Sequence, residues 1–215
     1  MNEIMTGSRR EFLRNAAVGL TWLPASAGYL AGSDVIRVGL IGCGGRGEAA
    51  ALNAMNADKG VQLVAMADLL MDRVQEKRTA LRLKKPDQVQ VTDDRCFAGF
   101  DAYRRVIECS DVVIIANAAK FHPLHMKAAI EAGKHVFVEK PHAIDPAGVK
   151  VVAEACELAR RKKLCVVSGL QSRYHPGYIE TVRRIHEGAI GEVVAIEENF
   201  LRAPYVLYPR RPGLT

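Results

Sequence analysis

The sequence predicts an α/β fold, a Rossmann-type doubly wound parallel sheet. Short runs rich in β-branched residues alternate with longer helical patterns from Val35 onward, which is typical of a parallel sheet covered by helices. The runs are continuously apolar rather than alternating, as expected of strands buried on both faces. A glycine-rich turn, Gly42-Cys43-Gly44-Gly45-Arg46-Gly47, follows the first run directly and precedes a helical pattern. With 49% hydrophobic and 25% charged residues, the chain suits a globular protein with a substantial core.

Each predicted element has its own local signal. The helix after the glycine turn ends at Asp58-Lys59-Gly60, and the helix over 123–132 ends at Gly133, a C-terminal cap. Another helix opens at Asp145-Pro146, a cap residue followed by a first-turn proline. Its apolar spacing places Cys156 in the core. Strands are predicted at 35–41, 61–67, 89–91, 111–116, 135–138 and 164–168.

The alternation of strand and helix patterns stops after Leu170. A crossover leads to a predicted helix over 178–187 and a strand-like segment over 192–201. One helix and one strand cannot enclose a core, so the expected division is a dinucleotide-binding domain at 34–170 and the incomplete start of an α+β substrate domain at 171–215. We therefore expect a fragment, or an interrupted copy, of a longer protein.

The first 33 residues resemble a bacterial twin-arginine signal peptide and linker. Ser8-Arg9-Arg10 precedes a moderately apolar stretch over 16–23, and Ala25-Ser26-Ala27 offers a cleavage site. We expect export of the folded protein to the periplasm, with the twin-arginine export machinery as a partner. The apolar stretch is far below the roughly 18 residues of a spanning helix, so no permanent membrane anchor is expected. An ordinary amphipathic first helix is the alternative.

Composition argues against two other classes of site. The five cysteines are scattered without a C-x-x-C pair, and His122 and His125 have no third ligand nearby in sequence, so no metal site is predicted. The net charge of +6 comes from short basic runs without interleaved aromatic residues. We therefore expect no nucleic-acid partner, and interpret these runs as solvated helix ends.

The glycine turn predicts a dinucleotide site. Its glycines, with Gly45 and Arg46 between them, would bring backbone amides and a helix N-terminus to a pyrophosphate. Asp68 ends the second predicted strand, 21 positions after Gly47, where a carboxylate binds ribose hydroxyls and repels a 2′-phosphate. NAD is therefore favoured over NADP, although Arg73 or Lys84 could fold back towards a phosphate. The alternative for Asp68 is a helix cap.

Several ordered motifs together resemble the glucose-fructose oxidoreductase, inositol dehydrogenase and rhizopine-catabolism (Gfo/Idh/MocA) family between about Val35 and Phe200. They are the glycine turn, Asp68, Ala116-Asn117 with His122 downstream, Ala132-Gly133-Lys134-His135-Val136, Glu139-Lys140-Pro141 and Gly188-Ala189-Ile190-Gly191-Glu192.

The resemblance implies roles for the matching residues. Ala116, Asn117 and His122 would line the cofactor, and Glu139 and Lys140 would face the nicotinamide. Lys140 would be the catalytic residue, stabilising negative charge or relaying a proton beside a reacting hydroxyl. The resemblance also implies a cis peptide before Pro141.

The sequence gives weaker arguments for a functional role of two further residues. Arg173, in the crossover, could contact substrate or cofactor. His125 is expected to be a packing residue or exposed. The second domain of the family would supply an aspartate and a histidine, which are missing here, so the chain by itself is expected to be inactive; the full-length form is expected to be a homo-oligomer.

Three functions stay open from the sequence. The first is an NAD(P)-dependent oxidoreductase, or a fragment of one, that transfers hydride between nicotinamide and a secondary alcohol of a sugar, cyclitol or derivative. The second is an NAD-dependent glycosidase of the same fold. The third is a non-catalytic dinucleotide-binding remnant, because fold alone does not guarantee activity.

Overall fold

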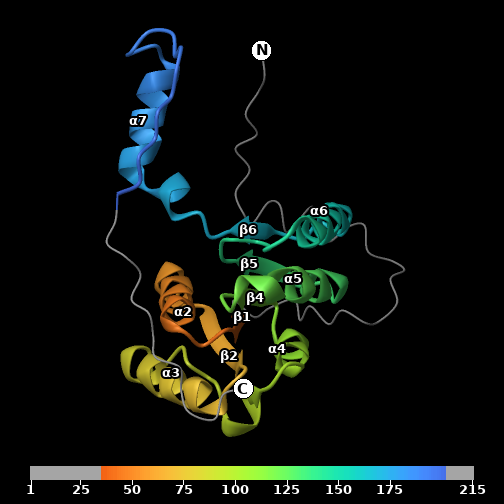
Figure 1. Ribbon diagram of the computed structural model, residues 1–215. Coiled ribbons are helices and arrows are strands. Elements are labelled where there is room, and N and C mark those ends of the chain that lie inside the picture. The colour runs from red at the N-terminus through yellow and green to blue at the C-terminus, as the bar shows by residue number, and fades with distance from the viewer. Residues whose placement is uncertain (1–34, 202–215) are drawn as a thin grey trace, which may run out of the picture.

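A computed structural model describes residues 35–201 (Figure 1). Its centre is one six-stranded parallel sheet with the order β3-β2-β1-β4-β5-β6, the Rossmann strand order. The prediction of a doubly wound α/β fold is confirmed. The predicted signal segment lies outside the described residues. The strands are β1 (Ile36–Ile41), β2 (Val61–Asp68), β3 (Cys96–Ala98), β4 (Val112–Ile115), β5 (His135–Val138) and β6 (Val166–Ser168).

Helices cover both faces of the sheet. In Figure 1, α2 and α3 lie on one side and α4, α5 and α6 on the other. Two buried apolar clusters follow this division, one including Ala50 and Leu81 of the first pair of helices, the other Val106 and Ile130 of the second group. The α-helices are α2 (Gly45–Ala57), α3 (Met71–Lys84), α4 (Ala102–Cys109), α5 (His122–Glu131), α6 (Pro146–Arg161) and α7 (Pro176–His186).

The local helix signals act as predicted. The Asp145 carboxylate accepts a hydrogen bond from the Gly148 amide at 2.6 Å, so it caps α6. Gly133 has a φ of 74°, the left-handed conformation in which the chain leaves α5 for β5. Cys156 is half-buried and packs against the larger apolar cluster. Within residues 35–201, none of the helices has both the length and the hydrophobicity of a transmembrane span.

The position of the third strand differs from the prediction. Residues 89–91 were expected to form it, but Val89 makes a single bridge to Leu63. A 3₁₀ turn, η1 (Asp93–Arg95), then moves the chain along the sheet, and β3 pairs with the last three residues of β2. Val89 and Val91 are nevertheless buried. Their apolar character reflects burial beside the sheet rather than strand pairing.

The strand predicted at 192–201 is wrong for the described residues, because none of 192–201 is in a strand. A strand needs a neighbour for its backbone hydrogen bonds, and this segment pairs with none in the described part of the chain. Its large apolar side chains are exposed: Val194, Ile196 and Phe200 each have more than three quarters of their surface accessible. The helix α7 that precedes it has no buried residue and stands away from the sheet in Figure 1.

Candidate dinucleotide site

The glycine turn joins β1 to α2, and two of its glycines are sterically required. Gly42 has a φ of 102°, and a Cβ there would lie 2.4 Å from the Asn117 backbone nitrogen. A Cβ on Gly47 would lie 1.9 Å from the Gly42 carbonyl oxygen. Gly44 has no heavy atom within 4 Å of where its Cβ would be. The turn is therefore packed tightly against the protein at Gly42 and Gly47 and open at Gly44, where another molecule could approach the backbone.

Asp68, the last residue of β2, binds the glycine turn directly. Its carboxylate accepts hydrogen bonds from the Cys43 amide at 2.7 Å and the Leu70 amide at 3.3 Å. The N-cap position of α3 is Leu70, and no side chain caps that helix. Asp68 is therefore not the helix cap that was its alternative interpretation. It fixes the turn while also lining the cavity beside it.

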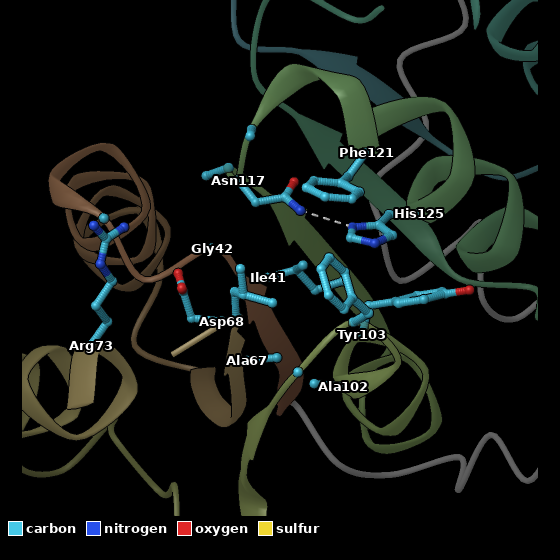
Figure 2. A pocket seen from close by; sticks show the side chains of 16 residues that line it. Ile41, Gly42, Ala67, Asp68, Arg73, Ala102, Tyr103, Asn117, Phe121 and His125 are labelled. Atoms are coloured by element: carbon cyan, nitrogen blue, oxygen red, sulfur yellow. Dashed lines mark hydrogen bonds between the residues drawn. The ribbon is translucent and has the colours of Figure 1, made fainter. Parts of the chain in front are cut away.

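The cavity lies along the carboxyl ends of β1, β2 and β4 and has a volume of about 280 Å³ (Figure 2). The predicted residues Gly42, Gly44, Asp68, Ala116 and Asn117 all line it. Ligands of open α/β sheets bind at this edge, where the order of the strands reverses. Arg73, the possible phosphate ligand, lines the same cavity.

His125 also lines the cavity, a role that sequence reasoning missed. It is buried, as a packing residue would be, and its ring stacks on Tyr103 and Phe121 at centroid distances of 4.2 and 5.8 Å. The Asn117 Nδ2 lies 3.1 Å from its Nδ1, the contact drawn in Figure 2. Burial, with a smaller contribution from His122, lowers the pKa of His125 to about 4. Its spacing from His122 gave no usable signal, because His122 itself is not in the cavity wall.

His122, predicted to line the cofactor, is buried and does not line this cavity. Its Nδ1 lies 2.8 Å from the Pro141 carbonyl oxygen and its Nε2 lies 2.9 Å from the Asn117 carbonyl oxygen. Both partners are carbonyl oxygens, which only accept hydrogen bonds, so the donor is the His122 ring. The ring lies between the loop after β4 and the loop after β5 and contacts both.

Glu139, Lys140 and Pro141 leave β5 at the same edge of the sheet. The Glu139 carboxylate is buried, with Oε1 2.5 Å from Arg46 Nη2; the two groups are not aligned for a hydrogen bond, so the contact is ionic. The Lys140–Pro141 peptide is cis, as the resemblance implied. Lys140 is exposed and is not in the wall of the 280 Å³ cavity.

The structure does not bring Arg173 to the cavity. It belongs to the 3₁₀ helix η3 (Gln171–Tyr174) and lines a separate groove with Tyr178 and Val182 of α7. Gly45 and Arg46 form the first turn of α2, beside the cavity but outside its wall. Within residues 35–201, no group of three or more His, Cys, Asp or Glu side chains is arranged to hold a metal ion.

Comparison with known proteins gives consistent matches for the sheet domain. The chain is 30% identical over 161 residues to an inositol 2-dehydrogenase/D-chiro-inositol 3-dehydrogenase of Halalkalibacterium halodurans, covering 75% of this chain and 43% of that protein. It is 34% identical over 158 residues to inositol 2-dehydrogenase 4 of Saccharopolyspora erythraea, covering 73% and 42%. The chain thus spans less than half the length of these relatives.

Solved structures of related proteins also match about three quarters of this chain. A 3-ketoreductase from Actinomadura kijaniata, in complex with NADP and TDP-benzene, matches with a TM-score of 0.55 and 27% identity, over 74% of this chain and 44% of that one. The scyllo-inositol dehydrogenase of Lactobacillus casei, with bound NAD(H) and scyllo-inositol, has a TM-score of 0.60 at 22% identity, over 74% and 43%, which supports the fold alone.

A family model described as "Oxidoreductase family, NAD-binding Rossmann fold" matches residues 36–169. This range spans β1 to the end of β6 and contains the glycine turn, Asp68 and Glu139-Lys140-Pro141. The chain therefore belongs to the Gfo/Idh/MocA oxidoreductase family.

Proposed function

We propose that this chain is the cofactor-binding part of an oxidoreductase that uses NAD to oxidise a secondary alcohol of a sugar or cyclitol, or to reduce the corresponding ketone. The observation that carries this is the cavity that the glycine turn and Asp68 line together. The residues fit a dinucleotide, because a Cβ at Gly42 or Gly47 would collide with backbone while Gly44 faces open space. The amides of the turn would hold the pyrophosphate at the N-terminus of α2.

The choice of NAD rests on Asp68. A carboxylate at the end of β2 accepts hydrogen bonds from ribose hydroxyls and repels a 2′-phosphate. Arg73 lines the same cavity and would attract that phosphate. The Asp68 carboxylate is fixed by two backbone amides, that of Cys43 in the glycine turn and that of Leu70 before α3, whereas Arg73 lies on α3 itself, so we favour NAD.

Lys140 is the proposed catalytic residue. The nicotinamide ring, when bound, accepts or gives the hydride. The Lys140 ammonium would stabilise charge on the reacting oxygen of the substrate, or carry its proton. The exposure of Lys140 leaves it accessible to a substrate at the carboxyl edge of the sheet. The inositols named for the two dehydrogenase relatives support a cyclitol as the substrate class.

Titration calorimetry of the purified chain with NAD, NADP and ADP-ribose tests the cofactor site. We expect NAD to bind more tightly than NADP. Asp68→Asn should reduce that preference about tenfold, because a neutral amide no longer repels the phosphate. Asp72→Asn, an exposed acid in the first turn of α3, is the matched control and should preserve the preference. Failure of the wild-type chain to bind either dinucleotide would refute the proposal.

A second assay separates the oxidoreductase from the glycosidase alternative. In a full-length protein that carries this domain, net accumulation of NADH with a cyclitol or sugar alcohol supports the oxidoreductase. Cleavage of a glycosidic bond without NADH accumulation would instead identify a glycosidase.

We also propose that the protein is exported to the periplasm by the twin-arginine route. The support is the order of Ser8-Arg9-Arg10, the apolar stretch and Ala25-Ser26-Ala27. Replacing Arg9 and Arg10 with lysine should leave the protein in the cytoplasmic fraction of a bacterium that has this route. Immunoblots of periplasmic and cytoplasmic fractions measure the outcome, and unchanged export of the Arg9→Lys, Arg10→Lys variant would contradict the proposal.

A further inference from the structure

Glu139 is buried in a position that leaves its carboxylate few possible partners. Its side chain is 7% exposed. A Cβ on Gly169 would lie 2.5 Å from Glu139 Oε1 and 2.9 Å from Oε2, so the end of β6 closes one side of the carboxylate. The backbone is fixed too, because the Glu139 amide donates to the Ile115 carbonyl at 2.9 Å. A side chain at position 169 would therefore displace this carboxylate from its present place.

Arg46 supplies the positive charge for this carboxylate. Its Nη2 lies 2.5 Å from Oε1, and no other cation pairs with Glu139 in the described part of the chain. A buried charge is strongly unfavourable unless it is paired. The pair is asymmetric, since the Arg46 side chain is 48% exposed and can be hydrated while Glu139 cannot.

The ion pair connects two parts of the proposed site. Arg46 lies in the first turn of α2, within the glycine turn, and Glu139 immediately precedes Lys140 and the cis peptide. Loss of Arg46 would leave the Glu139 carboxylate buried without a counter-charge, and the segment would move to hydrate it. Lys140 would move with it.

We propose that Arg46 is a positioning residue, which holds Lys140 at the nicotinamide end of the site through its ion pair with the buried Glu139 carboxylate. This inference rests on the proposed function. It assigns Glu139 to the support of the Lys140 loop, rather than to direct contact with the nicotinamide.

Lysine footprinting tests the inference on the full chain. Acetylation of Lys140 is followed by mass spectrometry with and without NAD, each protein being given NAD at about ten times its own Kd. At that occupancy, a Lys140 covered by NAD should be labelled about tenfold more slowly in the wild type. Exposed Lys150 on α6 is the internal control and should be labelled at one rate throughout.

The protection of Lys140 by NAD should differ among three variants in a defined order. In Arg46→Gln, protection of Lys140 should fall to about twofold or less, because the unpaired carboxylate displaces the loop. In Glu139→Gln, protection should fall less, to about fivefold, because the freed arginine is half exposed and remains hydrated. The double variant should regain most of the protection, since two neutral amides of similar shape leave no buried charge.

Arg78→Gln is the matched control, because Arg78 forms a pair of the same length, 2.5 Å, with Asp93, whose side chain is 94% exposed. It should behave as wild type. Equal protection in Arg46→Gln and wild type, or a double variant no better than Arg46→Gln, would overturn the inference. So would NAD binding to the wild type without protection of Lys140. Failure of the wild type to bind NAD at all would instead refute the proposed function.

Discussion

Residues of one type have different roles here, set by what surrounds them. His122 and His125 lie three positions apart on α5, and both are buried. Both ring nitrogens of His122 face carbonyl oxygens, one on each of two loops. The His125 ring is instead enclosed by Tyr103 and Phe121 and meets the Asn117 amide. The first residue joins loops, and the second forms the wall of the cavity.

Replacing His125 with phenylalanine should remove part of the pH dependence of folding. The pKa of His125 is lowered from 6.5 to about 4 in the folded chain, mainly by burial. Between these pH values the unfolded chain binds a proton that the folded ring does not, so the free energy of unfolding falls as the pH falls through this window. The change amounts to as much as about 3 kcal/mol.

Urea unfolding of wild type and His125→Phe at several pH values from 8 to 4 measures the effect. At pH 8 both folded and unfolded rings are neutral, so the difference there reports packing and the lost contact with Asn117 alone. The stability difference between the two proteins should then shift in favour of the variant as the solution is acidified. A stability difference between the two proteins that stays constant as the solution is acidified would contradict the lowered pKa of His125.

At the scale of elements, the junction of β1 and α2 determines the geometry of the site. The Gly42 amide donates to the Ala67 carbonyl at 2.8 Å, and the Asp68 carboxylate accepts from the next amide, that of Cys43, at 2.7 Å. Burial raises the pKa of the Cys43 thiol, so this cysteine stays a neutral core residue within the turn. The end of β2 thus holds the turn by hydrogen bonds, while the backbone of Asn117, after β4, packs against Gly42.

Gly47→Ala and Gly45→Ala form a matched pair for this junction. A Cβ at Gly47 would lie 1.9 Å from the Gly42 carbonyl oxygen, whereas Gly45 has open space around it. Gly47→Ala should lower the free energy of unfolding by about 1–3 kcal/mol and weaken NAD binding, because α2 must move away from the turn. Gly45→Ala should change stability by less than about 1 kcal/mol.

Urea unfolding and NAD titration of both variants check this expectation. Similar losses in the two would contradict the assigned role of the Gly42 contact, because Gly45 has no such neighbour and helix propensity by itself favours alanine over glycine.

At the scale of the whole molecule, the parallel sheet gathers the candidate site at one edge. Five residues of the site end a strand or follow one: Gly42 (β1), Asp68 (β2), Asn117 (β4), Glu139 (β5) and Gly169 (β6). They lie at one edge although 127 positions separate Gly42 from Gly169. Residues 169–201, the described part of the chain beyond β6, contribute nothing to the two apolar clusters. Its helix α7 contacts mainly the adjacent η3.

This contrast predicts uneven protection from hydrogen exchange. Amides of α7 should exchange far faster than those of β1 and β4, because α7 buries no residue while those strands lie in the middle of the sheet. Exchange followed by mass spectrometry of peptic peptides measures this. Protection of α7 equal to that of α5, a buried helix on the sheet, would show a partner for α7 that the described residues lack.

The sequence by itself determined the fold class, the order of the elements and the glycine turn with Asp68, because these depend on local periodicity, capping and steric need at particular positions. It misplaced the third strand and predicted a strand at 192–201, since apolar runs indicate burial or β-propensity without naming a partner.

Only the tertiary structure decided which residues meet. Arg46 and Glu139 lie 93 positions apart, and their ion pair exists because α2 begins and β5 ends at the same edge of the sheet. His125 became part of the cavity because β4 and α4 bring Asn117 and Tyr103 to it. Such contacts depend on how the elements pack in three dimensions, and local sequence patterns carry no record of that packing.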